Sequence, residues 1–295
     1  MKLENINRAQ LDSALNGETV DYLYHFGVCS SDNVLKDLKG LKAIVMAGSA
    51  DRIERMAQTW SQKNNKAKIL KFPKDERFSV YYTGGVLFSS HGMGMPSISI
   101  AVQELMKLVY FVKRGDLTEM DKVFWCRVGT SGGVGLLPGS VVVTTESLLP
   151  DFKPYRLFVA GKEHFFDSKF PEKCIDEIIK ASSKEKINTV RGKTIGANSF
   201  YIEQNRVDGA IALCTEKEKM DWLKKAESLG VKNIEMETPL VSGFLNHWGF
   251  SNFAAICCTL LNRLNGDQIN STHEELENYS VNAETVLWNY LEKIK

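Results

Sequence analysis

The sequence predicts an α/β fold, a single domain in which helices cover both faces of a central mixed, mostly parallel sheet and so form three layers, α/β/α. Short apolar runs bounded by glycine, which are typical of buried strands, recur along the 295 residues. Segments with the helical spacing of apolar residues alternate with these runs. No repeat, low-complexity segment or linker divides the chain, so we expect one domain over residues 1–295.

The first half of the chain contains the strand that we expect to lead to the active site. It covers residues 123–129 and runs directly into Gly-Thr-Ser-Gly-Gly-Val-Gly. Ligands of open α/β sheets bind beyond the carboxyl ends of strands, so this strand end is the first candidate site. Other apolar runs predict strands over 41–48, 86–92 and 141–145. Apolar spacing predicts helices over 53–63 and 98–113.

The second half of the chain begins with a predicted long loop over 146–170, a stretch without a clear period. Thr215 and Glu218 form the pattern of a capping box, and Gly230 suits the end of the helix that follows. Strands are expected over 189–196, 231–237 and 253–261. Helices are expected over 171–182, 216–229, 239–247 and 281–294.

The composition is that of an ordinary globular chain, with 43% hydrophobic and 25% charged residues and a net charge of +1. This balance gives no sign of a nucleic-acid partner or of binding to a charged membrane surface. No uninterrupted apolar stretch reaches the length of a membrane span, and residues 1–16 lack the apolar core of a signal peptide. None of the six cysteines forms a Cys-x-x-Cys pair. We therefore expect reduced, mostly buried thiols in a cytoplasmic protein, without zinc or disulfides.

A phosphate-sized anion is the first ligand that the residues suggest. Arg52, Arg77 and Arg127 lie at or near strand ends or glycine turns, where guanidinium groups can bind phosphate oxygens. Thr130 can add a hydroxyl group, and the turn before Arg52 places backbone N–H groups at a helix N-terminus. Glycine at 129, 132, 133 and 135 would let a ligand approach the backbone. Each arginine could equally be a solvated surface residue.

Two further groups of residues suggest that the ligand also contains a base and a sugar. Gln204 and Arg206 could hold the edge of a flat heterocycle, with Phe200 as a stacking face. Glu235 and Glu237 follow a predicted buried strand, where one carboxylate could accept hydrogen bonds from two sugar hydroxyls. The alternative for each glutamate is a position on the surface or at a helix start, which the nearby proline at 239 favours. Together the three groups indicate a nucleoside and inorganic phosphate.

Several motifs follow one another in the order seen in a known enzyme family. They are Tyr-His-Phe-Gly at 24–27, Gly-Ser-Ala-Asp-Arg at 48–52, Ser-His-Gly-Met-Gly-Met-Pro-Ser-Ile-Ser-Ile at 90–100, Arg-Val-Gly-Thr-Ser-Gly-Gly at 127–133, Phe-Tyr-x-x-Gln-x-Arg at 200–206, Asn-Ile-Glu-Met-Glu at 233–237 and Thr-Leu-Leu-Asn-Arg-Leu-x-Gly-Asp-Gln at 259–268. With these motifs the chain resembles the uridine phosphorylases of nucleoside phosphorylase family I, and the eukaryotic type most closely. The resemblance runs from about Tyr22 to Gln268 and implies a nucleoside phosphorylase-like fold.

The resemblance implies a role for each candidate residue. The phosphate ligands would be Gly48, Arg52, Arg77, Arg127 and Thr130. The ribose ligands would be His25, Met236 and Glu237. The uracil ligands would be Phe200, Gln204, Arg206 and Arg263. Arg77 and His25 would reach the active site of a neighbouring subunit, so the resemblance implies at least a homodimer with shared sites.

The implied reaction is the phosphorolysis of uridine to uracil and ribose 1-phosphate, a pentosyl transfer of pyrimidine salvage and catabolism. Thr130 would help to hold the attacking phosphate, while Gln204 and Arg206 would stabilise the negative charge that develops on the departing base. No covalent intermediate, metal or organic cofactor is implied. Deoxyuridine and thymidine remain open as further substrates. Purine-cleaving relatives carry an aspartate near the end of the last strand, whereas this chain has Leu261-Asn262-Arg263 there.

One departure from the family pattern concerns the loop before Arg206. Glu203 stands where a small residue or glycine is usual, and Asn205 where glycine or glutamate is common. Asparagine tolerates a left-handed backbone and glutamate does so poorly, so the loop could sit differently and alter base selectivity. A paralogue that binds nucleoside without turning it over therefore remains an alternative. A purine phosphorylase is disfavoured by the missing aspartate, and a nucleosidase that uses water is disfavoured by the three arginines.

Overall fold

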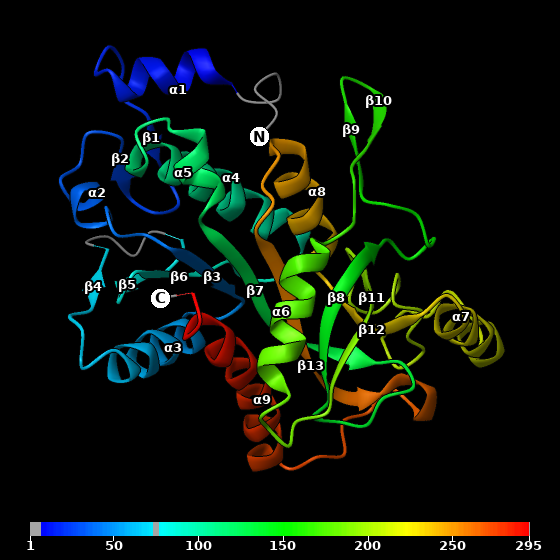
Figure 1. Cartoon of the computed structure of the whole chain (residues 1–295). Coiled ribbons are helices and arrows are strands. Elements are labelled where there is room, and N and C mark those ends of the chain that lie inside the picture. The colour runs from blue at the N-terminus through cyan, green and yellow to red at the C-terminus, as the bar shows by residue number, and fades with distance from the viewer. Residues whose placement is uncertain (1–6, 73–76, 295) are drawn as a thin grey trace. The chain divides into compact units, whose positions relative to one another are not determined.

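The computed structural model describes residues 7–72 and 77–294 (Figure 1). These residues belong to two compact units. The first unit contains the described part of 1–126 together with 244–253, and the second contains 127–243 and 254–294. The expectation of one domain over 1–295 extends beyond the described residues and stays a prediction.

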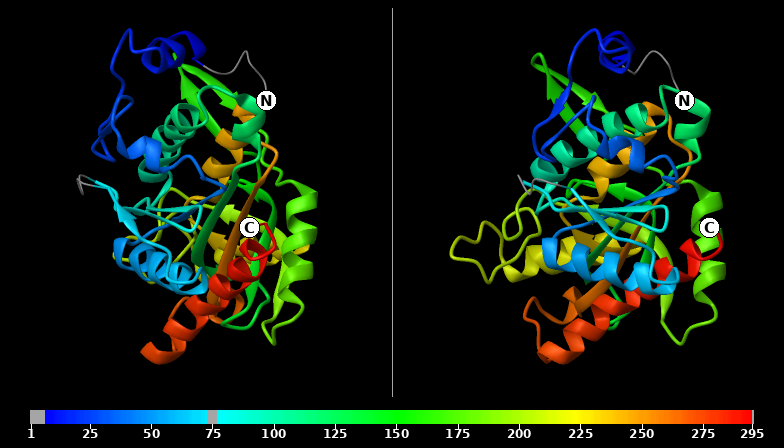
Figure 2. Two further views of the ribbon diagram at one scale, coloured as in Figure 1. Left: turned by 60° about the vertical axis from the view of Figure 1, so that its left-hand side comes forward. Right: turned by 90° about the vertical axis from the view of Figure 1, so that its left-hand side faces the viewer.

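The first unit is built on a small mixed sheet. Strands β3 (Ala43–Ala47) and β6 (Val86–Ser90) pair in parallel, with Ala43 opposite Val86 and Ala47 opposite Ser90. Strands β5 (Val80–Thr83) and β4 (Leu70–Lys71) extend the sheet in antiparallel fashion. Helices α3 (Ala50–Lys63) and α4 (Met95–Val112) lie on opposite sides of these strands in both views (Figures 1 and 2).

The remaining elements of the first unit surround α4. Residues 7–40, for which the sequence predicts no element, form α1 (Arg8–Leu15), β1 (Tyr22–Leu23), β2 (Val28–Cys29) and α2 (Val34–Asp37), and α5 (Leu117–Asp121) follows α4. Among the described residues, α4 is the one helix long and apolar enough to cross a membrane, with a mean hydropathy of 1.2 over 18 residues. However, 56% of that stretch is buried inside the structure, as is typical of a core helix.

The second unit is built on five strands in the order β12-β11-β8-β13-β7. Their bounds are β7 (Phe124–Gly133, which begins in the first unit), β8 (Val141–Leu148), β11 (Thr189–Gly196), β12 (Val231–Glu235) and β13 (Phe253–Asn262). Strand β11 pairs in parallel with β8 and β12, whereas β13 is antiparallel to β8 and the end of β7 is antiparallel to β12. The sheet is therefore mixed, and the predicted α/β class is confirmed.

The helices of the second unit pack on these strands. Helix α6 (Glu172–Ser182) packs on β8 and β11 and carries α9 (His273–Leu291), while α7 (Glu216–Ser228) packs against β12. Helix α8 (Thr238–Trp248) begins shortly after β12, and the 3-10 turn η2 (Arg263–Asn265) follows β13. The capping box predicted at Thr215 and Glu218 is present, because the N–H of Glu218 donates to Thr215 Oγ1 and the N–H of Thr215 donates to Glu218 Oε2.

Three predictions differ most from the structure. Strand β7 continues to Gly133, because Gly132 and Gly133 pair with β12. Helix α9 begins at His273, where a capping box supplied by Thr272 starts it well before the apolar pattern that predicted a start at 281. The stretch 146–170 is not one long loop, because it contains the end of β8 and the hairpin of β9 (Arg156–Val159) and β10 (Lys162–Phe165).

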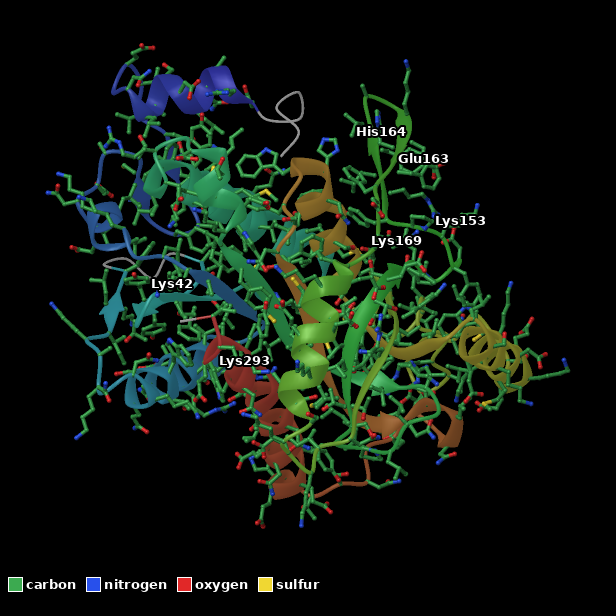
Figure 3. All side chains as sticks on the ribbon, in the orientation of Figure 1. Lys42, Lys153, Glu163, His164, Lys169 and Lys293 are labelled. Carbon is green, nitrogen blue, oxygen red and sulfur yellow. The ribbon has the colours of Figure 1, made fainter. Side chains whose placement is uncertain are left out.

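The β9–β10 hairpin escapes sequence patterns because both of its faces are largely exposed. Its strands pair only with each other among the described residues, and Phe158 and Phe165 are exposed. Without a buried face there is no alternation of apolar and polar residues to detect. Its turn is made by Ala160 and Gly161, with φ of 49° and 77°, as in the two-residue turns that favour hairpins. Figure 3 shows Glu163 and His164 on the hairpin.

The cysteines are mostly buried thiols, as predicted. All six cysteines are free, and Cys126, Cys174, Cys257 and Cys258 are buried.

Candidate functional site

In the first unit, the predicted strand–turn–helix around Gly48 is confirmed. The parallel strands β3 and β6 end side by side, so that the N–H of Gly92 donates to the carbonyl of Gly48 at 3.0 Å. Ser49 caps α3, because its Oγ accepts the N–H of Arg52 at 3.3 Å. Arg52 thus lies in the first turn of a helix whose N-terminus follows a glycine, with a half-buried side chain. Gly48 and Arg52 are brought together as expected for an anion site.

The structure also brings His25 and Arg77 together. The carbonyl of His25 accepts the N–H groups of Arg77 and Phe78 at 3.2 and 3.1 Å, and the Arg77 side chain is exposed. His25 Nδ1 lies 2.6 Å from Oε1 of Glu104, a residue of α4 that no sequence pattern singles out. The Nδ1 edge of the ring is thus occupied by a carboxylate of the chain itself. The predicted contact of His25 with ribose stays a prediction.

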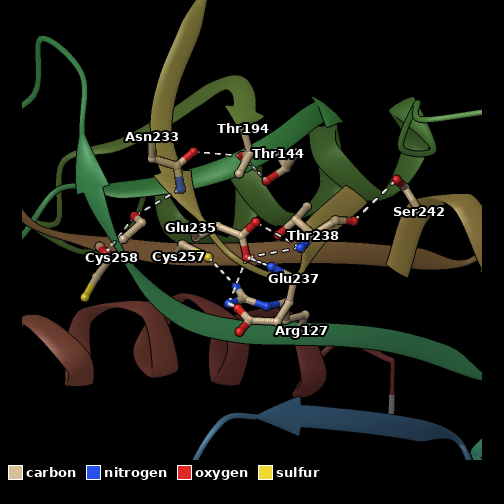
Figure 4. A network of polar contacts seen from close by, with 11 residues as sticks. Arg127, Thr144, Thr194, Asn233, Glu235, Glu237, Thr238, Ser242, Cys257 and Cys258 are labelled. Atoms are coloured by element: carbon tan, nitrogen blue, oxygen red, sulfur yellow. Dashed lines mark hydrogen bonds and ion pairs between the residues drawn. The ribbon is translucent and has the colours of Figure 1, made fainter. Parts of the chain in front are cut away.

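In the second unit, a buried arginine lies between two carboxylates (Figure 4). Arg127 Nη2 is 2.9 Å from Glu235 Oε2 and also donates to Glu237 Oε2. Its Nη1 donates to Cys257 Sγ at 2.8 Å. The predicted phosphate ligand Arg127 and the predicted ribose ligand Glu237 are therefore in direct contact.

Local structure explains where these carboxylates lie. Glu235 ends β12 and accepts the N–H groups of Glu237 and Thr238 at 2.9 Å, at the start of α8. A carboxylate at a helix N-terminus is favourable, so the helix-start alternative holds for Glu235. Asn233, earlier on β12, accepts a hydrogen bond from Thr194 at 2.7 Å and donates to Ser131 at 3.0 Å. These buried contacts fix the strand that ends at Glu235, two residues before Glu237.

Burial and charge act in opposite directions on this cluster. Burial raises the pKa of Glu235 to about 7, although the Arg127 cation opposes the change. Burial also raises the pKa of the Cys257 thiol to about 11. Burial would lower the pKa of Arg127, but Glu235, Cys257 and Glu237 raise it overall, so the guanidinium stays charged.

The raised pKa of Glu235 predicts a pH dependence of stability. Since the pKa rises from an ordinary 4.5 to about 7, the contribution of this carboxyl is complete below pH 4.5 and is lost as the pH rises through 7. Glu235→Gln should lack this change. Urea unfolding of both proteins should therefore show that the native protein loses stability relative to the variant as the pH rises from about 5 to about 8. A difference that grows with pH would show that the carboxylate is the stabilised form.

Two of the glycines make room for arginine side chains of the chain itself. A Cβ atom at position 129 would lie 2.6 Å from Arg127 Nη1, and one at position 132 would lie 3.0 Å from Arg263 Cδ. Gly129 and Gly132 therefore have a role that the sequence did not suggest, because the expected reason was close approach of a ligand.

Thr130 and Met236 are less tightly placed. Thr130 is partly exposed on β7, and none of the described residues hydrogen-bonds to its side chain. Met236 is partly exposed between β12 and α8. Their predicted roles with phosphate and ribose stay predictions.

The predicted base-binding residues are assembled on one side of the second unit. The guanidinium of Arg206 lies 4.6 Å from the ring centre of Phe200. Arg263 Nη2 donates to the Gln204 carbonyl at 2.8 Å, and its Nη1 donates to Gln204 Oε1 at 3.3 Å. Asp208 accepts two hydrogen bonds from Arg206, from Nε at 2.9 Å and from Nη2 at 2.6 Å. Asp208 was not identified from the sequence as a partner of Arg206. Its position two residues after Arg206, in a turn, was the signal that could have indicated this pairing.

The loop before Arg206 accommodates both unusual residues. Asn205 has a φ of 52°, in the left-handed region that asparagine tolerates. Glu203 is not among the residues with positive φ, and its Oε2 accepts the N–H of Asn198 at 2.6 Å. Glu203 therefore closes the turn without a left-handed backbone, and the expected difference in the position of this loop stays a prediction. Its effect on base selectivity stays a prediction.

Comparison with known proteins gives four informative similarities. Residues 42–293 match a family described as the Phosphorylase superfamily. The chain is 34% identical over 283 residues to uridine phosphorylase 1 of Mus musculus. This match covers 92% of the present chain and 88% of the mouse protein. It is 29% identical over 293 residues to inactive uridine phosphorylase B of Schistosoma mansoni, covering 96% and 95% of the two chains. The crystal structure of uridine phosphorylase from Schistosoma mansoni in complex with thymidine gives a TM-score of 0.87 at 29% identity, over 95% of this chain and 96% of that one.

The family match spans most of both units, and the similarity to the mouse protein covers nearly the whole of each chain. The motifs at 48–52, 127–133, 200–206 and 233–237 lie within the matched region, and the structure places them at strand ends and turns. The chain therefore belongs to the Phosphorylase superfamily and, within it, to the eukaryotic uridine phosphorylases.

Proposed function

We propose that the protein catalyses the phosphorolysis of uridine to uracil and ribose 1-phosphate. The observation that carries the proposal is the contact between Arg127 Nη2 and Glu237 Oε2 in the second unit. A cation suited to phosphate and a carboxylate suited to sugar hydroxyls are placed side by side. Phosphate held by the one would lie next to the sugar held by the other, as direct transfer of the pentosyl group requires.

Phosphate is the nucleophile in this proposal. Arg127 would bind its oxygens together with the hydroxyl of Thr130, which lies on the same strand. The phosphate roles of Arg52 and Gly48 in the first unit stay predictions. Arg127 would then share its Nη2 hydrogens between phosphate and the carboxylates that it contacts. Glu237, relieved of part of this contact, would accept hydrogen bonds from the ribose hydroxyls, with Met236 packing on the sugar.

The base departs as an anion in this proposal. Gln204 and Arg206 would hydrogen-bond to the uracil edge, and Phe200 would cover the ring face. Negative charge builds on the pyrimidine as the glycosidic bond breaks, so donors fixed at its edge lower the barrier. Arg263 would act on uracil mainly by holding Gln204, which it contacts through both the amide and the backbone.

The proposal extends to assembly and location. A homodimer would let His25 and Arg77 of one subunit complete the site of the other, and the exposed Arg77 side chain supports this. A cytoplasmic location is supported by the free, mostly buried thiols. We propose thymidine and deoxyuridine as further substrates. The support is the crystal structure of uridine phosphorylase from Schistosoma mansoni, which contains thymidine. The absence of a metal, an organic cofactor or a nucleic-acid partner stays a prediction.

A nucleoside-binding paralogue without turnover is the alternative. It is supported by the similarity to a protein named inactive uridine phosphorylase B and by the unusual Glu203. The discriminating assay follows the absorbance of uridine with and without inorganic phosphate. Loss of uridine only when phosphate is present is the expected result. Loss without phosphate would indicate a nucleosidase, and binding without loss would favour the paralogue.

Gly129→Ala should impair this reaction through Arg127. The new Cβ would lie 2.6 Å from Nη1, whereas ordinary contact begins at 3.4 Å, so the guanidinium must move. A shift of about 1 Å in a positioning group costs about a hundredfold in rate. We expect that loss in kcat/KM for phosphate, measured with uridine saturating. Since φ at Gly129 is not positive, alanine is compatible with the backbone, and an unchanged kcat/KM would contradict the role of Arg127.

A further inference from the structure

Behind the base-binding residues of the second unit lies a chain of buried charges. Lys219 of α7, Asp267 and Arg263 are 3%, 6% and 1% exposed. Lys219 Nζ lies 2.8 Å from Asp267 Oδ2, and Arg263 Nε donates to Asp267 Oδ1. Buried ion pairs are weak stabilisers, because desolvation offsets the attraction between the charges. The position of this chain suggests a function other than stability.

The charge chain ends on Gln204. Arginine can only donate hydrogen bonds, so the contact of Arg263 Nη1 with the amide at 3.3 Å assigns Oε1 to the side facing Arg263. The second donor, Nη2, holds the Gln204 carbonyl at 2.8 Å. The Gln204 amide is therefore oriented with Nε2 turned away from Arg263. An oriented N–H donor suits a carbonyl oxygen of a dioxopyrimidine.

The same short segment also holds Arg206. The carbonyl of Asp267 accepts Arg206 Nη2 at 3.2 Å. Gln268 Nε2 donates to Asp208 Oδ2 at 2.6 Å, and Asp208 in turn binds the Arg206 guanidinium. Asp267 is thus connected to both residues that would bind the uracil edge, to Gln204 through its carboxylate and to Arg206 through its backbone.

We propose that Asp267 and Lys219 are positioning residues for base recognition. Asp267 fixes Arg263 and thereby the amide of Gln204, and Lys219 fixes the Asp267 carboxylate by binding its second oxygen. Neither side chain has a role as a ligand in the proposed reaction. The inference rests on the proposed function, because it assigns these residues to the recognition of uracil.

The test compares Lys219→Met with Lys217→Met. Both lysines lie on α7 and pair with acidic residues, but Lys217 is exposed and pairs with Asp221 at 2.6 Å. We expect Lys219→Met to raise KM for uridine about tenfold, the effect of one lost hydrogen bond, with KM for phosphate unchanged. Lys219→Arg, which can still bind Asp267, should restore most of the uridine KM. Lys217→Met should behave like the native protein.

Asp267→Asn gives the second arm, with a larger expected rise in KM for uridine because Arg263 loses its counter-charge. If this variant does not fold, Lys219→Met decides, because it leaves the Asp267–Arg263 pair in place.

The inference is overturned if Lys219→Met leaves the KM for uridine unchanged, or if it changes the KM values for uridine and phosphate equally. The proposed function still stands in that case, provided that the native protein turns over uridine. If the native protein binds uracil without turnover, the proposed function fails, and the same comparison is made on the Kd of uracil. If it neither turns over uridine nor binds uracil, both fail.

Discussion

Replacing Arg127 by methionine is expected to lower the free energy of unfolding by about 3–5 kcal/mol, the usual effect of removing one partner from a buried ion pair. Arg127, Glu235 and Glu237 are all nearly inaccessible to solvent. Without the guanidinium, two carboxyl groups would lie close together in the interior, and each one that is ionised would have no counter-charge. Phosphate-dependent cleavage of uridine should be lost at the same time, because Arg127 would supply the central phosphate contact. Urea unfolding and the absorbance assay measure the two effects.

A combined variant separates the effect on folding from the effect on catalysis. Arg127→Met together with Glu235→Gln and Glu237→Gln removes the unpaired charges and leaves side chains of similar size. We expect most of the lost stability to return, because neutral amides can be buried at far lower cost than carboxylates. Activity should stay absent. A combined variant no more stable than Arg127→Met would show that the destabilisation arises from lost packing and not from charge.

Replacing Arg206 by methionine is expected to lower kcat by about a hundredfold to a thousandfold, the usual effect of removing a donor from a site where negative charge develops. The effect should depend on the leaving group. The fluorine of 5-fluorouridine withdraws electrons and stabilises the departing base, so the loss should be smaller with that substrate. Single-turnover rates with uridine and 5-fluorouridine measure this difference.

Arg156→Met is the matched control for Arg206→Met. Arg156 also binds two carboxylates, those of Asp151 and Glu163, but it lies at the β9–β10 hairpin. Its replacement should leave kcat unchanged. If Arg206→Met slows both substrates by the same factor, Arg206 contributes to binding and not to stabilising the leaving group.

The sheet and its helices could be predicted because their signals are local. The apolar runs at 41–48 and 253–261 each became a strand, and the spacing at 98–113 became α4. The hairpin at 156–165 could not be predicted in this way, because it buries neither face. The start of α9 was misplaced because its first turns are polar, although Thr272 and Glu275 carried a capping signal.

The residues of the candidate site could be predicted from local motifs, whereas their contacts with one another could not. Single residues such as Arg127 and Glu237 could be identified from motifs, but their pairing joins β7 to the start of α8 and depends on the fold. The two glycines that make room for arginine side chains were assigned to a ligand, because a sequence does not show which atoms approach a backbone. Lys219 had the pattern of an ordinary helix-surface lysine, and only its burial against Asp267 separates it from Lys217.

The most direct test of the central claim follows phosphorus and uracil together. The protein is mixed with uridine and inorganic phosphate, and ³¹P NMR is recorded while uracil is measured by chromatography. We expect ribose 1-phosphate to form at the expense of inorganic phosphate, one molecule for each uracil released. Release of uracil with an unchanged phosphorus spectrum, or uridine binding with neither product, would contradict phosphorolysis.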